Sequence, residues 1–522
     1  MVFNGLTKKD SSVLKGLAIL GIVLHNYFHH LSPSPGENEF LFSPNTIHIF
    51  FQMLGEQPAE FINLIFSYLG HFGVQVFILL SGYGLAISMT KHPKDWTTFM
   101  VDRLKKLYPL LLTGIIVLML YKIVDTKTFF GQYEWNEIKY KLLFTATLVP
   151  YSGLSLNGPW WFFGLIFELY VLFPLLYKLL KRFDWKAFVG ICLMSYLLIY
   201  LFRNVFTLYQ GEILMMNAPG HLPEFCLGIL LAFHKEIKIH PLWLVGAVIV
   251  FCLGNFYASF YPFTFLAVTV IALFLYHGMK SIPHRKGWIA KAMTHFGELS
   301  MVLFAVHGFF RDPFLNITNL GNGFGAHLLS FLLFFLTVWI VALGAKKIYE
   351  CLLGAFAFIR IRESRTTNII SIVLQIAFGL FFAYVLAYYV IQNKRSPEKE
   401  MEDFQIKPTE VSVSNDTEYV GIANVKLDAR PVILKIEGSF DMTSLDTVSR
   451  LPIIVYDIAG VLWDKTVIPQ EFNTSRHNRY SFSYEYKCPL NKSIKGKNLK
   501  VYFWNNSKGS IEAKDIELTV KY

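Results

Sequence analysis

The stretch LKGLAILGIVLHNY, residues Leu14–Tyr27, decides the class of this protein, because it is long and apolar and yet contains Lys15 and His25. Similar apolar stretches recur along the first three quarters of the chain. An ionisable side chain is costly in the hydrocarbon core of a bilayer, so in a multispanning protein it normally faces a protein-lined cavity and belongs to a functional site. The stretch therefore predicts a membrane span with a functional site around His25.

The composition excludes an ordinary soluble domain, since apolar residues make up 54% of the 522 residues and charged residues only 16%. The formal net charge of +11 comes from Lys and Arg in short connections beside the apolar stretches. This distribution predicts membrane topology rather than a nucleic-acid partner. The five cysteines show neither a disulfide framework nor metal-ligand spacing. We therefore expect a multispanning membrane protein that holds no metal.

Eleven apolar stretches are predicted to cross the bilayer, since about 20 apolar residues span its core. They are residues 13–28, 65–89, 107–123, 159–180, 188–201, 222–233, 242–256, 263–276, 299–310, 328–345 and 369–391. Clusters of Lys and Arg occupy alternate connections, which predicts a cytoplasmic N-terminus and a C-terminus outside. The loop at residues 33–60 then faces outward, on the side where we expect the acceptor.

The composition changes to a polar linker after the last apolar stretch. Beyond it, short alternating runs such as Val432–Ile436, Tyr480–Tyr484 and Leu499–Trp504 lie between turn signals, which is typical of an antiparallel β-sandwich. We predict an α-helical polytopic membrane domain at residues 1–392, a linker at 393–412 and an extracytoplasmic all-β sandwich at 413–522.

Three ionisable residues are predicted to share one depth in the membrane. His25 lies ten residues beyond Lys15, roughly 15 Å along a helix that rises from the cytoplasm. His307 and Glu168 lie about as far along helices of their own. A neutral imidazole is suited to general-base catalysis near pH 7, and a carboxylate can orient it. The alternative for each of the three is a structural contact between helices, and it is weakest for His25 because that helix carries further polar residues.

Six motifs give the chain a recognisable pattern. In order they are LKGLAILGIVLHNY, GVQVFILLSGYGLAISM, DRLKKLYPLLL, NGPWWFFGLIFELYVLFPLL, HLPEFCLGILLAF and FGELSMVLFAVHGFF. The order and spacing resemble those of the integral-membrane family called acyltransferase type three, over roughly residues 13–350. The resemblance implies an acyltransferase that moves acyl groups, usually acetyl from acetyl-CoA, onto hydroxyl groups of envelope polysaccharides or glycolipids.

The resemblance also implies roles for particular residues. Arg103 matches a cytoplasmic-edge element, where it, Lys105, Lys106 and Lys15 are expected to hold the phosphates of coenzyme A by charge-assisted hydrogen bonds. The alternative is a topology signal alone, which applies more to the lysines than to Arg103. The expected catalytic residues are His25, Glu168 and His307, and the expected substrate-binding residues are Asn26, Trp160 and Glu224.

Two positions depart from the family pattern. The family histidine follows its basic residue by eleven positions, where this chain has Asn26, and His25 comes one residue early. One residue turns a helix face by about 100°, so either His25 has taken the role or the role has moved; we favour His25. The second motif lacks a carboxylate because Gln75 replaces an aspartate.

The β region resembles jelly-roll carbohydrate-binding modules in its closing stretch, LKVYFWNNSKGSIEAKDIELTVKY. Two other classes stay open beside the acyltransferase. One is a transporter or flippase of a glycan or lipid-linked intermediate, because polar groups near the midplane also mark transport pathways. The other is a membrane-anchored glycan-binding protein. For each class we expect a multi-pass protein of the cell membrane, with the bilayer and a glycan or glycolipid as partners.

Overall fold

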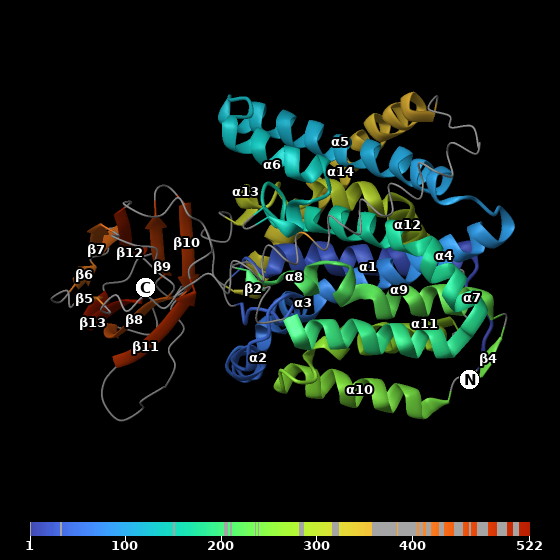
Figure 1. Cartoon of the computed structure of the whole chain (residues 1–522). Helices are drawn as coiled ribbons and strands as arrows, with labels where there is room; N and C mark the ends of the chain where they lie inside the picture. The colour runs from blue at the N-terminus through green and yellow to red at the C-terminus, as the bar shows by residue number, and fades with distance from the viewer. Residues whose placement is uncertain are drawn as a thin grey trace. The chain divides into compact units, whose positions relative to one another are not determined.

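The computed structural model describes residues 2–357 except 32–33, 150–151, 203–206, 209–210, 235, 239, 281–286 and 316–322. Beyond residue 357 it describes Tyr384 and the strands β5–β13. The chain divides into two units, Met1–Ala387 and Tyr388–Tyr522. The first is helical and the second consists of strands (Figure 1). The division falls just before the predicted linker at residues 393–412.

The first unit is built from apolar helices joined by short connections. The longer ones are α1 (Lys8–Phe28), α4 (Gly73–Lys91), α5 (Trp96–Thr126), α7 (Trp161–Phe202), α9 (Ala218–Phe233), α10 (Pro241–Phe256), α11 (Thr264–Lys280), α12 (Trp288–Val306) and α14 (Phe324–Ala357). The shorter ones are α2 (Pro44–Glu56), α3 (Phe61–Leu69), α6 (Gln132–Leu142), α8 (Ile213–Met216) and α13 (Asp312–Leu315), with 3₁₀ turns that include η2 (Gly70–Phe72).

Seven helical segments of the described part are long and apolar enough to cross a membrane. They are Lys8–Phe28, Pro58–Lys91, Trp96–Thr126, Gly158–Phe202, Tyr261–Gly278, Trp288–Val306 and Phe324–Ala357. These segments make the chain a multi-pass membrane protein. The count of eleven crossings stays a prediction, and its last span, residues 369–391, lies outside the described residues apart from Tyr384.

The long helix α7 is a helical hairpin. Its backbone leaves helical geometry at Asp184, where φ is 51° and ψ is −131°. Glu168, before this point, accepts a hydrogen bond from the backbone N–H of Ala218, and Ser195, after it, donates one to the carbonyl of Pro219. Because both halves of α7 contact the start of α9, the chain reverses at Asp184, between the predicted spans 159–180 and 188–201.

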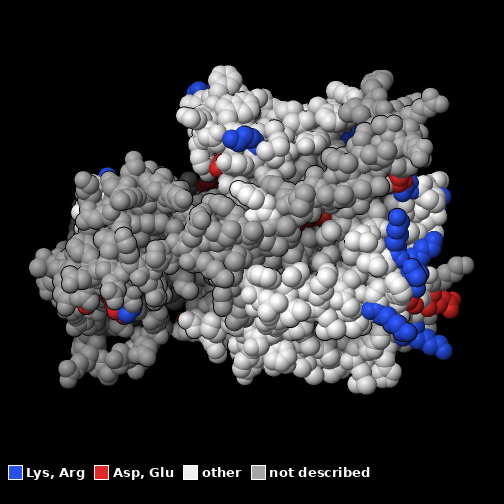
Figure 2. Space-filling model, viewed as in Figure 1, with Lys and Arg blue, Asp and Glu red and all other residues white. Residues whose placement is uncertain are grey.

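One end of the helical unit collects several segments that the sequence predicts on the cytoplasmic side. Strand β1 (Val2–Phe3) pairs with β4 (Ile237–Lys238), and His234 contacts Asp184 at 2.8 Å. Figure 2 shows Lys and Arg side chains gathered at this end, which carries the N-terminus and β4 in Figure 1. The arrangement agrees with the alternation of basic connections, while the orientation across the membrane stays a prediction.

Helix α1 lies at the centre of the unit and packs closely against α12. Two reciprocal hydrogen bonds fix its start. The Thr7 hydroxyl accepts one from the backbone N–H of Asp10, and the Asp10 carboxylate accepts the other from the backbone N–H of Thr7. A Cβ on Gly16 would lie 2.0 Å from the carbonyl oxygen of Met293, so only glycine allows this approach. Farther along, Asn26 of α1 meets the segment after α12, which shows that the two helices run parallel.

The second unit contains two antiparallel sheets. Their strands are β5 (Phe404–Ile406), β6 (Val411–Val413), β7 (Tyr419–Lys426), β8 (Ile433–Met442), β9 (Ile453–Ile458), β10 (Val461–Thr466), β11 (Arg479–Lys487), β12 (Asn498–Trp504) and β13 (Ile511–Lys521). One sheet has the order β10-β9-β12-β7, and the other β11-β8-β13-β5, with β6 also pairing with β13. Leu499 and Val501 are buried and Lys500 is exposed, as the alternating pattern predicts. The jelly-roll sandwich itself stays a prediction.

Candidate functional site

A cavity of about 410 Å³ surrounds the end of α1, and we call it the histidine pocket. It is lined by side chains from α1, the loop after it, η2, the start of α7 and the end of α12. These are Ile22, His25, Asn26, His29, His30, Glu37, Glu39, Phe40, Leu41, His71, Val74, Leu154, Gly158, Pro159, Trp161, Phe304 and Arg311. Four histidines, two carboxylates and one arginine thus share a pocket with apolar walls. Such a grouping is typical of a binding or catalytic site.

His25 is buried in the last turn of α1 and is held from both sides. Its Nδ1 lies 3.2 Å from the carbonyl oxygen of Phe66, and its Nε2 lies 2.7 Å from Oε2 of Glu37. A carbonyl oxygen only accepts hydrogen bonds, so Nδ1 carries a hydrogen and Nε2 is the atom that can exchange a proton. His25 therefore presents its reactive nitrogen to the pocket with a carboxylate beside it.

Glu37 is the centre of the histidine cluster. Besides His25, its Oε2 lies 3.6 Å from Nδ1 of His29 and 4.0 Å from Nδ1 of His71. Burial opposes ionisation of this carboxyl, but the neighbouring His29 and His25 outweigh burial and hold the pKa of Glu37 below its usual range. Glu39 behaves in the opposite way, because burial and the charge of Glu37 raise its pKa well above the usual value.

Gly70 allows the histidine cluster to form. It begins η2, and a Cβ built there would lie 2.6 Å from the carbonyl oxygen of Gly21 and 2.6 Å from Cβ of His25. The backbone of η2 therefore lies directly against α1, next to the catalytic candidate. Any larger residue at this position must separate the two elements.

The other polar residues predicted near His25 also lie at this end of α1. Asn26 lines the pocket and donates a hydrogen bond from its side-chain amide to the carbonyl of Ile22. Its backbone carbonyl accepts a hydrogen bond from the Arg311 guanidinium at 3.3 Å. His307 follows α12 directly and is fully buried, with Nδ1 3.0 Å from the carbonyl oxygen of Leu303. His25, Asn26 and His307 lie at the ends of their helices. The layer of ionisable residues that the sequence predicts near the middle of the membrane therefore lies closer to the end of α1.

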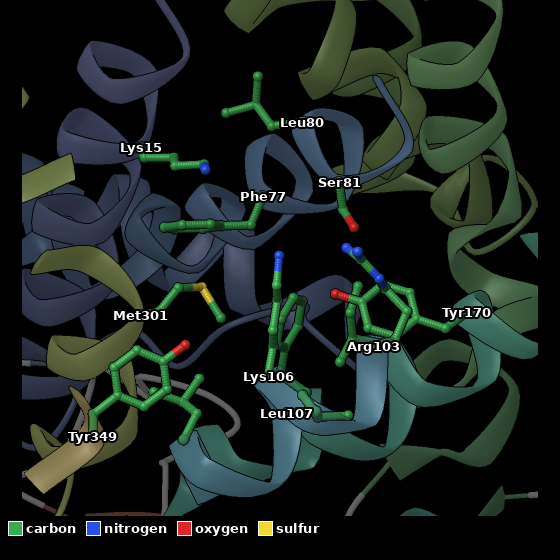
Figure 3. Close-up of a pocket in the computed structure, with 13 residues that line it drawn as sticks. Lys15, Phe77, Leu80, Ser81, Arg103, Lys106, Leu107, Tyr170, Met301 and Tyr349 are labelled. Atoms are coloured by element: carbon green, nitrogen blue, oxygen red, sulfur yellow. The ribbon is translucent and has the colours of Figure 1, made fainter. Parts of the chain in front are cut away.

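A second cavity, of about 270 Å³, contains the predicted donor-binding residues, and we call it the basic pocket (Figure 3). It is lined by Lys15, Phe77, Leu80, Ser81, Arg103, Lys106, Leu107, Leu110, Phe162, Ile166, Tyr170, Met301 and Tyr349. Figure 3 shows the amine of Lys106 directed into the space near Phe77, with the Arg103 guanidinium close to Tyr170. Three cationic groups from two helices thus face one cavity, which is suited to a polyanion.

Lys105 does not line this pocket, although the sequence groups it with Arg103 and Lys106. Its amine lies 3.8 Å from a carboxylate oxygen of Asp102, which also forms an ion pair with Lys94. On a helix, adjacent residues point about 100° apart, so three basic residues within four positions cannot all face one cavity. A donor-binding role for Lys105 stays a prediction.

An apolar constriction, which we call the neck, lies between the two pockets. It is formed by Val74, Phe77, Phe162, Met301 and Phe304, and it has no room for a water molecule. Phe77, Phe162 and Met301 also line the basic pocket, whereas Val74 and Phe304 also line the histidine pocket. The rings of Phe162 and Phe304 meet edge to face, with centroids 5.2 Å apart. The neck is therefore closed, and side chains alone close it.

The two pockets are stacked along the helix axes. On α1, Lys15 lines the basic pocket and His25 the histidine pocket, ten residues or about 15 Å farther on. On α7 the order is reversed, since Trp161 lines the histidine pocket and Tyr170 the basic pocket. The reversal is expected if α7 runs opposite to α1. The structure thus arranges a basic pocket, a neck and a histidine pocket in line.

The three remaining predicted residues are buried elsewhere. Glu168 accepts from the N–H of Ala218 at 2.7 Å. Trp160 donates its indole N–H to the carbonyl of Ala305 at 2.8 Å, and Glu224 is fully buried with Oε1 2.7 Å from Nδ1 of His221. The first two contacts join one helix to another, whereas the contact of Glu224 with His221 lies within α9. Catalytic or substrate-binding roles for these residues stay predictions.

Sequence reasoning missed Glu37, His71 and Arg311. Glu37 lies in a polar loop and His71 in a short turn, where neither shows a periodic pattern. One signal was present, because Glu37 follows His25 itself by only twelve positions. A short loop keeps its residues near the helix end, so its carboxylates were candidates for pairing with His25.

Comparison with known proteins assigns this architecture to a family. Residues 9–346 match the sequence profile of the acyltransferase 3 family, which is described as an acyltransferase domain. The chain is also 31% identical over 138 residues to "Acyltransferase MdmB" of Streptomyces mycarofaciens. That alignment covers 25% of this chain and 34% of the relative, so it spans about a third of the relative's length. No solved structure matches the chain.

Proposed function

We propose, from the premise that this chain belongs to the acyltransferase 3 family of membrane acyltransferases, that it transfers an acyl group from a cytoplasmic acyl-CoA to a hydroxyl of an envelope or surface glycan. The family membership makes the chain an acyltransferase, and the proposal adds the donor, the acceptor and the residues. The observation that carries it is the alignment of the basic pocket, the neck and the histidine pocket along α1.

The basic pocket is the proposed site for the nucleotide end of the donor. Coenzyme A carries three phosphate groups, and Lys15, Arg103 and Lys106 offer cationic donors to them. With the nucleotide held there, the thin pantetheine arm points along the helix axes. We expect acetyl-CoA to be the donor, because a short acyl group suits a pocket that four histidines, two carboxylates and an arginine line.

The neck is the proposed passage for the thioester. Its walls are side chains of Val74, Phe77, Phe162, Met301 and Phe304. Side-chain rotation is fast compared with enzyme turnover, so donor binding can open the passage without a change in the backbone. The β-alanine and cysteamine end of the pantetheine arm is unbranched and fits such a passage, whereas the bulky nucleotide remains in the basic pocket.

The histidine pocket is the proposed site of chemistry. His25 Nε2 takes the proton from the acceptor hydroxyl, the resulting oxygen attacks the thioester carbonyl, the C–S bond breaks, and the leaving CoA thiolate takes up the proton from the His25 imidazolium. Glu37, 2.7 Å from Nε2, stabilises the imidazolium that forms. Arg311 lines the same pocket and offers positive charge to an oxyanion.

The acceptor is proposed to enter from the outer face, through the loop residues that line the histidine pocket. The polar side chains of that pocket suit a sugar, which presents several hydroxyl groups. The β unit is then a candidate for holding the polymer close to the membrane. The proposed location is the cell membrane, with a cytoplasmic N-terminus and the β unit outside.

The test is CoA release by the purified full-length protein from acetyl-CoA, with and without a cell-envelope glycan. His25→Ala should slow turnover about 10²–10⁴-fold, the usual loss for a general base. The matched control is His92→Ala, which removes an exposed histidine at the end of α4. A folded His25→Ala protein with full transfer would refute the assignment, and Asn26→Ala tests whether the role lies one residue later.

A further inference from the structure

The histidine cluster contains buried polar atoms that the proposed reaction does not use. Among the described residues, neither ring nitrogen of His71 has a well-aligned hydrogen-bond partner, although this side chain is only 3% exposed. Nδ1 of His29 and Oε2 of Glu37 also lack an aligned partner, even though Glu37 forms an ion pair with His25. Buried polar groups are nearly always satisfied, so such a group of orphans points to a missing ligand or ion.

Two residues with orphan atoms, Glu37 and His71, converge with His25 on one point. One ligating atom from each of His25, Glu37 and His71 lies within 4.8 Å of the other two. Around Oε2 of Glu37, the nitrogen of His25 is 2.7 Å away and Nδ1 of His71 is 4.0 Å away. Zinc holds nitrogen and oxygen ligands at about 2.0–2.2 Å, so tetrahedral neighbours are about 3.3 Å apart. The measured separations bracket that value, and small side-chain rotations reach it.

We propose that His25, Glu37 and His71 form a binding site for a divalent transition-metal ion, with Zn²⁺ as the best fit. Two imidazoles and one carboxylate suit zinc, whereas Mg²⁺ and Ca²⁺ prefer oxygen ligands alone. His29 also lines the histidine pocket, with Nδ1 3.6 Å from Oε2 of Glu37, and is a candidate fourth ligand. The sequence predicts no metal, because these ligands come from three separate segments and form no short spacing motif.

The ion and the acyl-transfer reaction compete for His25. A metal at this site takes the Nε2 lone pair that the proposed mechanism needs for proton abstraction. Zn²⁺ is therefore an inhibitor, and its removal restores activity. This part of the inference rests on the proposed function, whereas metal binding does not.

Binding is tested without any activity measurement. The full-length protein in detergent is treated with a chelator, dialysed and titrated with Zn²⁺ against a chromophoric indicator. One ion per chain is expected, and Co²⁺ should give the visible absorption of a four-coordinate site. His71→Gln should weaken Zn²⁺ binding more than about tenfold, since loss of outer-shell partners alone costs 10–100-fold. The matched control is His92→Gln, which should bind as the unmodified chain does.

Thermal unfolding shows whether each variant is folded, and Glu37→Gln serves as a second ligand variant if His71→Gln is not. Binding of no Zn²⁺, or unchanged binding by a folded His71→Gln or Glu37→Gln protein, would overturn the site. In the transferase assay, each variant is compared with its own zinc-free rate. Zn²⁺ should inhibit the unmodified chain and EDTA should reverse the inhibition.

The two proposals fail in different ways. If Zn²⁺ binds at one ion per chain but no acyl transfer is found, the metal site stands and the proposed function is refuted. If the enzyme is active and needs His25 but binds no Zn²⁺, the proposed function stands and the site is refuted. A bound ion that leaves an active enzyme uninhibited refutes the competition for His25.

Discussion

Replacing Gly70 with alanine tests whether the position of His25 against η2 controls the rate. The new Cβ would lie 2.6 Å from Cβ of His25 and from the carbonyl oxygen of Gly21, whereas ordinary contact begins near 3.4 Å. The two elements must therefore separate by about 0.8 Å, which is 3.4 minus 2.6. The backbone itself accepts alanine, since φ and ψ at Gly70 are −67° and −24°. The substitution thus acts through displacement alone.

A shift of about 1 Å at a catalytic group can cost about 10²-fold in rate. We expect Gly70→Ala to lower turnover by roughly that factor, and overpacking to lower the free energy of unfolding by about 1–3 kcal/mol. The control is Gly84→Ala in α4, where a new Cβ meets nothing within 4 Å. The assay is CoA release from acetyl-CoA, with thermal unfolding measured on the same samples.

Two results would contradict this reasoning. Full turnover by Gly70→Ala would mean that His25 tolerates the shift or has no part in the reaction. An equal loss of turnover in Gly84→Ala would mean that any added methyl group in this span disturbs the protein.

Three further predictions concern the donor, the β unit and a buried lysine. Arg103→Ala should raise the acetyl-CoA concentration needed for half-maximal rate, because Arg103 lines the basic pocket, and should leave the acceptor concentration needed for half-maximal rate unchanged. The control Arg182→Ala removes an exposed arginine and should change neither concentration. An effect on the acceptor concentration alone would mean that the donor and acceptor sides are reversed. Deleting residues 396–522 should preserve transfer to a small soluble acceptor but lower transfer to the polymer, because tethering raises the local acceptor concentration; loss of both activities in a folded protein would show that the β unit completes the site. Burial lowers the pKa of Lys141 in α6 from 10.5 to about 7, so its contribution to stability is complete above pH 10.5 and is lost as the pH falls through 7; the unfolding temperature should therefore rise with pH over this interval, and Lys141→Met should remove that part of the slope.

The sequence predicted the parts of the site that lie on apolar helices. His25 and Lys15 stand out because a charged or polar side chain in such a stretch is costly, and the structure places them at the two pockets of one helix. The reversal between residues 180 and 188 was predicted from a basic connection and is found at Asp184. Local pattern was sufficient in these cases, because each feature depends on residues close together in the chain.

The sequence failed where tertiary contacts decide. Glu37 and His71 come to His25 from a loop and a 3₁₀ turn, and their positions depend on the close approach at Gly70. Equal depth suggested Glu168 as a partner of His25, yet its carboxylate is bonded to the start of α9. Depth fixes one coordinate of three, so it cannot show which groups are in contact.

The neck has a consequence for the energy supply of the cell. Under the proposed topology, the basic pocket faces the cytoplasm and the histidine pocket faces outside. A water-filled connection between them would conduct protons and dissipate the electrochemical gradient, which stores about 2.3 kcal/mol per charge per 100 mV. Because Phe162, Phe304 and their neighbours leave no room for water, the neck closes this route in the resting enzyme. Even in turnover the pantetheine arm itself would fill the gap, so that an acetyl group crosses the membrane without a leak of ions.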